Sequence, residues 1–297
     1  PTSPDHEDMA FTELDRLVRL GMPLRVLRLV VSLVVYLFDR LSAILLAALR
    51  IGSRTRLVVI YYHNVPWKYK ARFTTQMKIL KSVTLPVSID ELSIQLAKPH
   101  KMRLLCAITF DDGYESVYNN AVPELSNSAI PFAIFIPSDS IGTSPLWIKD
   151  GNHRFSCEKV VNRDQIVDLS HNQFAIIGSH SRSHKDLTAL QEKEIEDEVV
   201  SSKRKLEGII RKSVDFISFP HGSFNDIVIG EARKADYKRA FSIDPTVIWL
   251  SNSDFVIGRI AVEPWDWPIE FYLKITGAYR WLPTAFRVKK LLRHILR

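Results

Sequence analysis

Acidic residues and histidines with metal-binding potential follow short apolar runs in this chain of 297 residues. Asp111, Asp112 and Gly113 come directly after one such run, and His180 and His184 stand four positions apart after a later one. Two imidazoles and one carboxylate hold a zinc-like ion and leave coordination positions open for water and a substrate. We therefore interpret Asp112, His180 and His184 as candidate ligands of a divalent metal.

Asp111 is a candidate general base rather than another ligand. Neighbouring residues on a strand point to opposite faces, so Asp111 and Asp112 are not expected to bind one metal in the same way. Gly113 allows unusual backbone dihedrals where the chain turns, so that Asp111 can face the attacking water. A bound metal would lower the pKa of that water, and Asp111 would take its proton. The oxyanion formed would be stabilised by the metal and a backbone N–H.

The elements that must position these residues are predicted by alternating short apolar runs and helical patterns. Continuous apolar strands alternating with helices predict a parallel sheet or an α/β barrel. The predicted strands are residues 57–62, 104–110, 132–136, 174–178, 216–219, 239–243 and 256–262. The predicted helices are residues 71–82, 115–127, 163–170, 191–211 and 225–235.

Four of these strands end on ionisable residues. His63 follows the first strand, the Asp111–Asp112 pair follows the second, His180 and His184 follow the fourth, and His221 follows the fifth. The active site of such a fold collects at the carboxyl ends of its strands. Each group alone is a weak signal, but together they predict a metal-site constellation at one edge of the sheet. The charged stretch 192–198 is interpreted as a solvated helix face.

Two motifs resemble those of the polysaccharide deacetylase family, also called NodB-like or carbohydrate esterase family 4. They are TFDDG at 109–113 and HSRSH at 180–184, within a resemblance that covers about residues 56–265. The resemblance implies an α/β fold with a distorted (β/α) barrel and metal-dependent removal of N-acetyl groups from amino sugars. It assigns Asp111 as the base and, as metal ligands, Asp112, His180 and His184.

The third family motif, commonly Arg-x-Pro-x-Gly, is changed here. Pro220 and Gly222 match it, but Ser218 replaces the arginine that normally orients the base. Arg259 is a candidate orienter by analogy. The backbone N–H of His221 matches the family's oxyanion donor, and its side chain either lines the pocket beside Pro220 or lies at the rim of the loop.

The general acid is predicted on the first strand. The family usually takes an acid histidine from the C-terminal part, but the only histidine after His221 is His294, in the basic tail. Members similar to poly-N-acetylglucosamine deacetylases take it from the first strand instead, and the stretch YYHNV at 61–65 resembles that arrangement. His63 would then protonate the leaving amine. The alternative is a buried histidine bonded to the backbone.

Trp147 lies in the stretch PLW at 145–147, which resembles the family's Leu-Trp or Phe-Trp loop. Tryptophan faces stack on sugar rings, so Trp147 is a candidate substrate-binding residue, with a packing role as the alternative. Trp265 and Trp267 leave the same two alternatives open.

The expected cofactor is Zn²⁺, although a site of two histidines and one aspartate also accepts Co²⁺, Ni²⁺, Mn²⁺ or Fe²⁺. The expected partner is an N-acetylated amino sugar in a bacterial glycan or a lipid-linked glycolipid precursor. The alternative is a catalytically inactive carbohydrate-binding protein on the same barrel, suggested by the changed third motif and the missing C-terminal histidine.

The most apolar segment, residues 24–49, predicts a helix at a membrane surface. Asp39 and Arg40 interrupt its apolar run, and a central charged pair is costly for a helix that spans a bilayer. Arginines flank the segment on both sides, which is typical of an interfacial helix. The alternative is an amphipathic helix packed on the domain's own core.

The formal net charge of +7 lies at the ends of the chain. Residues 1–56 hold 8 basic and 6 acidic residues, and residues 280–297 hold 6 basic and none acidic, so the remainder carries −1. Positive charge at both ends of the chain suits contact with an anionic membrane surface. The sequence contains no nucleic-acid-binding motif, so no nucleic-acid partner is expected.

The expected organisation has four parts. Residues 1–15 form a flexible segment, residues 16–55 a helical membrane-surface anchor, and residues 56–279 the barrel. Residues 280–297 form a basic amphipathic helix, which either docks on the domain or touches anionic lipid.

We expect association with the inner membrane, on its cytoplasmic rather than its periplasmic face. No clear signal-peptide cleavage site accompanies the apolar segment, and Cys106 and Cys157 are too few for a disulfide framework.

Overall fold

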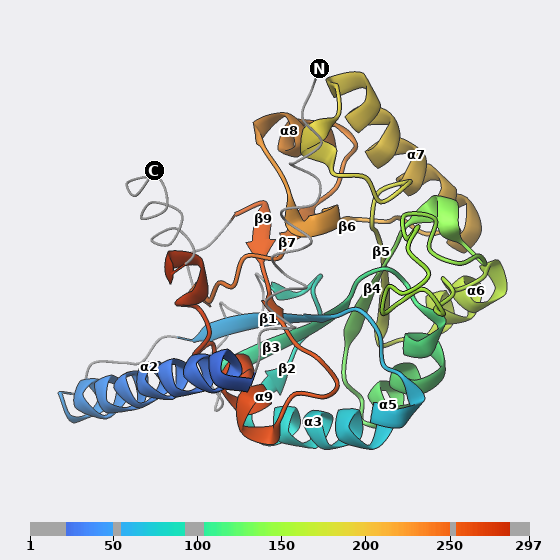
Figure 1. Cartoon of the computed structure of the whole chain (residues 1–297). Helices are drawn as coiled ribbons and strands as arrows, with labels where there is room; N and C mark the ends of the chain where they lie inside the picture. The colour runs from blue at the N-terminus through green and yellow to red at the C-terminus, as the bar shows by residue number, and fades with distance from the viewer. Residues whose placement is uncertain (1–21, 50–54, 93–103, 250–253, 286–297) are drawn as a thin grey trace.

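The computed structural model describes residues 22–49, 55–92, 104–249 and 254–285 (Figure 1). The predicted segment 1–15 lies outside the described residues. So does most of the predicted helix at 280–297, of which residues 282–285 form one helical turn.

A parallel sheet curved into a barrel forms the centre of the molecule (Figure 1). Its strands are short, apolar and almost entirely buried, as expected for a parallel sheet covered by helices. In sheet order the six main strands are β1 (Arg56–Tyr62), β3 (Leu104–Phe110), β4 (Phe132–Ile136), β5 (Ala175–Ser179), β6 (Phe216–Ser218) and β7 (Arg239–Ser242). Two short strands join them: β2 (Leu85–Pro86) pairs with β3, and β8 (Ile248–Trp249) runs antiparallel to β1.

The predicted strand at 256–262 is wrong as a single strand, because it divides at Arg259. β9 (Val256–Gly258) pairs with β7 at one end of the sheet, and β10 (Ile260–Ala261) pairs with β1 at the other. One short segment therefore bridges both edges of the sheet and nearly closes the barrel. This arrangement confirms the predicted distorted (β/α) barrel with a helical N-terminal extension.

The barrel strands alternate between two hydrophobic layers. Leu57 and Val59 belong to an inner cluster, whereas Val58 and Ile60 belong to the cluster under the helices. Alternation along a strand therefore turns odd-numbered residues of β1 into the barrel. The covering helices are α3 (Lys70–Val83), α5 (Val122–Asn127), α6 (Arg163–His171), α7 (Glu192–Ile210), α8 (Asp226–Lys234) and α9 (Pro268–Ile275).

The predicted helix at 115–127 is not a uniform α-helix. Residues Val117–Ala121 form a π-helical turn, labelled η2, and α5 follows with Pro123 in its first turn. Proline lacks the N–H that would continue the α-helical pattern, so the local change in winding has a chemical cause.

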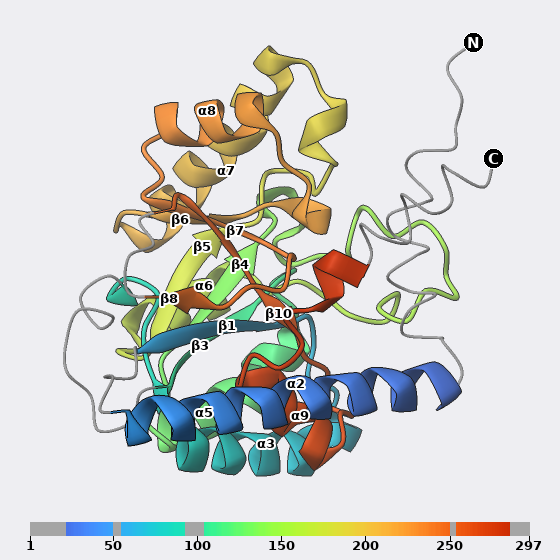
Figure 2. The ribbon, with the colours of Figure 1, turned by 90° about the vertical axis from the view of Figure 1, so that its left-hand side faces the viewer.

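The long helix α2 (Met22–Ala48) precedes the barrel and packs beside α9 (Figure 2). Its stretch Met22–Leu46 has a mean hydropathy of 2.1, and only 6% of its most apolar window is buried. A helix of this length and composition suits either a membrane anchor or a signal sequence.

Candidate active site and metal centre

The carboxyl ends of the barrel strands surround one cleft. The predicted ionisable residues that follow four different strands all reach this cleft, because parallel strands have their carboxyl ends at the same edge of the sheet. The cleft is lined by Tyr61, His63, Asp111, Asp112, Trp147, His153, Arg154, Phe155, His180, His184, Phe219, His221 and Ile243.

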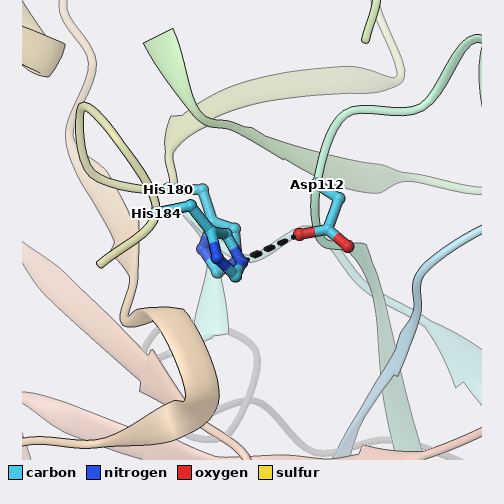
Figure 3. A group of neighbouring side chains, drawn as sticks. All are labelled: Asp112, His180 and His184. Atoms are coloured by element: carbon cyan, nitrogen blue, oxygen red, sulfur yellow. Dashed lines mark ion pairs between the residues drawn. The ribbon is translucent and has the colours of Figure 1, made fainter. Parts of the chain in front are cut away.

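Asp112, His180 and His184, which all line this cleft, lie close together (Figure 3). One carboxylate oxygen of Asp112 lies 3.1 Å from His184 Nε2 and 3.5 Å from His180 Nε2. All three side chains are buried, and their candidate ligand atoms lie within 4.8 Å of one another. The three donors are close enough together to share one cation.

The tautomer of His180 favours metal binding. Its Nδ1 lies 2.8 Å from the carbonyl oxygen of Ser218, which can only accept a hydrogen bond. His180 Nδ1 therefore carries the proton, and the lone pair of Nε2 faces the Asp112 carboxylate. Burial also lowers the pKa of His180 to about 4, so the ring is neutral at pH 7. A lone pair facing a carboxylate oxygen fits a cation between them, and neutral imidazole is the form that binds metal.

The motif HSRSH is held in place by Glu198 of α7. The buried Glu198 carboxylate accepts hydrogen bonds from the backbone N–H groups of Arg182 and Ser183, at 3.0 and 2.8 Å, and from the Ser183 hydroxyl. Stretch 192–198 is therefore not uniformly a solvated face, because its last residue points under the loop. A carboxylate that accepts several hydrogen bonds from one loop restrains it, so Glu198 fixes the loop between the two histidines.

Left-handed backbone conformations cluster at the site. Among the described residues other than glycine, seven have positive φ, and four of these belong to the site motifs: Asp112 (66°), Ser181 (60°), His184 (63°) and His221 (58°). Such conformations cost free energy and persist where surrounding contacts impose them. At the TFDDG motif the chain turns at Asp112 itself as well as at Gly113, which separates the directions of the two aspartates.

Asp111 is paired with Arg259. The guanidinium donates to both carboxylate oxygens, at 2.8 and 2.7 Å, and both side chains are buried, with Arg259 0% exposed. Arg259 also donates to Thr109 Oγ1 at 3.0 Å and to Ser218 Oγ at 2.7 Å. Arg259 thus contacts the serine that stands where the family motif usually has its arginine.

The charge of Asp111 is set by two opposing effects. Burial raises the pKa of Asp111, but the adjacent Arg259 guanidinium, with a smaller contribution from His180, more than offsets it. The net pKa of Asp111 is therefore below its usual value, and the group is a carboxylate at neutral pH.

His63 lies at the carboxyl end of β1, partly buried in the same cleft. Its ring centroid is 5.5 Å from that of Tyr61 and 5.6 Å from that of Phe155. The cleft therefore brings His63 together with the Asp111 carboxylate and the three candidate metal ligands, as the first-strand motif predicts.

Trp147 stacks on a candidate metal ligand. Its ring lies 4.2 Å from the ring of His184 with an angle of 15° between the planes. One face of the indole therefore supports His184, so packing is part of its role, while the residue also lines the cleft. Trp265 and Trp267 are not among the residues that line the cleft.

The turn Pro220–Gly222 brings His221 to the cleft wall. Left-handed φ values of 58° at His221 and 71° at Gly222 form the turn, and the His221 ring centroid lies 4.9 Å from that of His184. Burial lowers the pKa of His221 to about 3, with a further contribution from His184. His221 is therefore a neutral ring beside the candidate metal ligand His184.

Arg154 and Phe155 are cleft residues that the sequence did not single out. The Arg154 guanidinium lies 4.3 Å from the Phe155 ring centroid and donates to Glu263 at 3.1 Å. Both belong to a loop with no strand or helix pattern, so nothing in the sequence marked them.

Comparison with known proteins supports the family resemblance that the sequence motifs indicate. Residues 100–240 match the family model described as polysaccharide deacetylase. A putative polysaccharide deacetylase of Bacillus subtilis is 24% identical over 216 residues, covering 70% of this chain and 72% of the relative. The poly-beta-1,6-N-acetyl-D-glucosamine N-deacetylase of Staphylococcus aureus is 24% identical over 203 residues, covering 65% of this chain and 67% of the relative.

Two solved structures share the fold. IcaB from Ammonifex degensii has a TM-score of 0.61 at 20% identity, covering 75% of this chain and 97% of that structure. The Streptococcus pyogenes deacetylase PplD has a TM-score of 0.61 at 17% identity, covering 75% of this chain and 99% of that structure.

Proposed function

Because this chain belongs to the polysaccharide deacetylase family of carbohydrate deacetylase hydrolases, we propose that it removes an N-acetyl group from an amino sugar of a bacterial glycan or lipid-linked glycan precursor. The observation that carries this proposal is one cleft that joins the Arg259-bound carboxylate of Asp111 to the cluster of Asp112, His180 and His184. Metal-assisted hydrolysis of an amide by water uses a general base next to a metal-binding cluster.

The cofactor in this proposal is a divalent metal. Zn²⁺ is the expected ion, and Co²⁺, Ni²⁺, Mn²⁺ and Fe²⁺ are the alternatives. Asp112, His180 and His184 would hold it, and the neutral His180 with its protonated Nδ1 fits that role. When bound, such a metal lowers the pKa of water and polarises a carbonyl group.

Asp111 acts as the general base in this mechanism. Its carboxylate is ionised at neutral pH because Arg259 opposes the effect of burial, so it can accept the proton of the attacking water. The two hydrogen bonds from Arg259 hold both carboxylate oxygens in fixed directions. Arg259 is thus the proposed orienter of the base.

His63 is the proposed general acid. Imidazole is suited to donate a proton near neutral pH, and the leaving nitrogen of the sugar must gain one as the amide bond breaks. His63 lines the same cleft as Asp111, from a different strand.

The remaining cleft residues are assigned to the substrate. The backbone N–H of His221, on the turn that begins at Pro220, is the proposed donor to the developing oxyanion. The outer surface of Trp147 is proposed to contact the sugar ring, since its other face is stacked on His184.

Release of acetate from N-acetylglucosamine oligomers, with Zn²⁺ or Co²⁺ added, tests this function. Asp111→Asn and His180→Ala should each lower the rate by at least about 100-fold, since both remove a group used in the chemical step. Asp226→Asn, on the surface helix α8, is the matched control and should leave the rate unchanged. Unchanged acetate release in the first two variants would refute the mechanism.

The inactive carbohydrate-binding protein has less support than the enzyme. The changed third motif and the missing C-terminal histidine suggest this alternative, but Arg259 contacts Asp111 with two hydrogen bonds. Tight binding of metal and glycan without acetate release from any N-acetylated substrate would favour this alternative.

We also propose that the enzyme works at the inner membrane, on its cytoplasmic face. The apolar helix α2 supports membrane association, and the free thiols of buried Cys106 and exposed Cys157 suit a reducing compartment. A membrane-impermeant maleimide should therefore label Cys157 only after spheroplasts are lysed. Labelling in intact spheroplasts would assign the barrel to the periplasmic side.

A further inference from the structure

Helix α2 turns its polar side toward the barrel. Arg25, Ser32, Tyr36 and Asp39 are spaced by seven, four and three residues, which places them along one face of a helix. Within the described residues this face is also the less exposed one, and Ser32 is fully buried. The face of α2 against the protein therefore carries these polar residues beside apolar ones such as Leu29, which packs against the core, so it is not the purely apolar face usual for a surface helix.

Each of these four polar residues contacts a residue between positions 270 and 281. Arg25 donates to Glu270 at 2.6 Å, and the hydroxyls of Tyr36 and Tyr272 lie 2.6 Å apart.

Further along the same face, the Ser32 hydroxyl accepts a hydrogen bond from Trp281 Nε1 at 2.9 Å. Asp39 accepts from Arg280 at 2.7 Å and from Arg56 at 3.3 Å. The aspartate that interrupts the apolar run of the sequence is thus an internal contact. These pairs attach α2 to the domain along several turns.

The opposite face of α2 is apolar and exposed. Val34 and Phe38 are 61% and 68% exposed. A continuous aliphatic surface of this kind on a globular domain marks an interaction site. The large apolar side chains exposed on it are Val26, Leu27, Val30, Leu33, Val34, Leu37, Phe38, Leu41, Ile44 and Leu45.

The charges of α2 and its flanking sequence indicate what covers this surface. Asp39, the only acidic residue of the helix, is held by two arginines, whereas Arg40 is exposed. In the sequence, further arginines stand before and after the helix: Arg16, Arg19, Arg50 and Arg54. Cations at the borders of an apolar face match a bilayer with anionic headgroups.

We propose that α2 lies flat in the surface of an anionic bilayer, with its apolar face among the acyl chains and its polar face on the barrel. A spanning orientation would draw its docking partners into the hydrocarbon, including the charged groups of Glu270 and Arg280. The polar docking of α2 therefore favours an orientation parallel to the membrane.

The same docking attaches α2 to the loop that contains Trp265 and Trp267. Arg25 lies 4.3 Å from the Trp267 ring centroid and donates to the Trp265 carbonyl at 3.4 Å. Arg154, which lines the cleft, is paired with Glu263 at the start of the same loop. Resting on the proposed deacetylase function, this geometry selects an amino sugar carried on a lipid anchor as the substrate.

Flotation with vesicles tests the membrane contact without reference to activity. The full chain should float with vesicles that contain phosphatidylglycerol, and less at high salt. Val34→Glu with Phe38→Glu should reduce vesicle binding at least about tenfold. Ile227→Glu, at a residue of α8 that is 49% exposed, is the matched control and should bind normally. Unimpaired flotation of the double variant, or an oligomer that dissociates in it without any vesicle binding, overturns the proposal.

Depth measurements distinguish a flat from a spanning helix. Cysteines introduced at Leu27, Val34 and Leu41, seven residues apart on the exposed face, would carry a fluorophore in a Cys157→Ser background. Lipid-bound quenchers should report the same shallow depth at all three positions. A midpoint deeper than both ends would show a spanning helix and overturn the proposal.

Activity on two substrates separates this inference from the proposed function. In the Val34→Glu, Phe38→Glu variant, deacetylation of an N-acetylglucosaminyl lipid in vesicles should fall at least about tenfold, with soluble oligomers hydrolysed at an unchanged rate. Equal loss on both substrates, or on neither, overturns the inference about the lipid-linked substrate. Failure of the unmodified chain on both substrates would instead refute the deacetylase function, while the flotation result would stand.

Discussion

Arg259 and Glu198 help to organise the site, although neither is a candidate metal ligand. Arg259 binds both oxygens of Asp111, and Glu198 binds the backbone of the loop between His180 and His184. Each is buried and has several hydrogen-bond partners, so each can be tested by a substitution with glutamine.

Replacing Arg259 should shift the pH dependence of the reaction. In Arg259→Gln, burial is no longer opposed by a cation, so the pKa of Asp111 should rise and the acidic limb of kcat/KM should move to higher pH. At neutral pH we expect a loss of about 100-fold, because the base is also misaligned. pH profiles of acetate release measure both effects.

Arg259→Lys is the matched control, because it keeps the charge but loses the two-point contact. It should retain most of the normal position of the acidic limb while losing rate. An acidic limb that stays in place in Arg259→Gln would show that Arg259 does not set the charge of Asp111.

Glu198→Gln should weaken metal binding by about 10–100-fold, the usual cost of removing a group that orients metal ligands. The loop would lose its charged acceptor, and its left-handed residues Ser181 and His184 would be less constrained. Competition with a fluorescent zinc chelator measures the affinity. Glu196→Gln, on the exposed side of the same helix, should bind zinc normally; equal affinities in both variants would contradict the role of Glu198.

The short segment from β9 to β10 connects the two edges of the sheet. It pairs with β7 through one half and with β1 through the other, so it nearly closes the barrel and turns Arg259 into its interior. Gly258 precedes Arg259 at the point where the backbone passes closest to a neighbouring loop, since a Cβ there would lie 2.1 Å from the carbonyl oxygen of Asp244.

Gly258→Ala should therefore destabilise the fold by about 1–3 kcal/mol, the typical cost of overpacking, and should reduce activity through Arg259. Gly230→Ala in α8 is the control, since a Cβ there meets nothing within 4 Å and alanine favours a helix. Urea unfolding of both variants measures the effect. Equal free energies of unfolding in both variants would contradict this prediction, because they would show that the loop near Asp244 moves without destabilising the fold.

Across the whole molecule, charge and apolar surface are separated from the chemistry. Residues 57–279, which include the cleft, have a net charge of −1, whereas the excess positive charge belongs to the ends of the chain. Helix α2 lies beside α9 on one side of the barrel (Figure 2), and its outer face is apolar and exposed. The proposed catalytic site and the proposed membrane contact therefore belong to different parts of one chain.

Metal binding should stabilise the folded molecule as a whole. A ligand that binds only the folded state at 100 times its Kd adds about 2.7 kcal/mol, which corresponds to a rise in Tm of roughly 5–10 °C for a domain of this size. Calorimetry with zinc and after removal of metal by a chelator measures the difference. His184→Ala should show a much smaller rise, and a chain whose Tm does not respond to zinc would contradict the metal site.

The residue types and their order along the chain already determined much of the fold and of the candidate site. Apolar runs alternating with helical patterns predicted the barrel, and the ionisable residues at the run ends were brought into one cleft because parallel strands end at a common edge. Their exact ligand, base and acid roles remain proposals.

Only the tertiary structure decided which distant residues complete these local patterns. The contact of Arg259 with Asp111 joins residues 148 positions apart, and Asp39 meets Arg280 across 241 positions. The same packing buries Glu198 and turns the polar face of α2 inward. Sequence patterns report the periodicity of single elements, whereas the partner of a charged side chain depends on where other elements pack, and this is set by the fold as a whole.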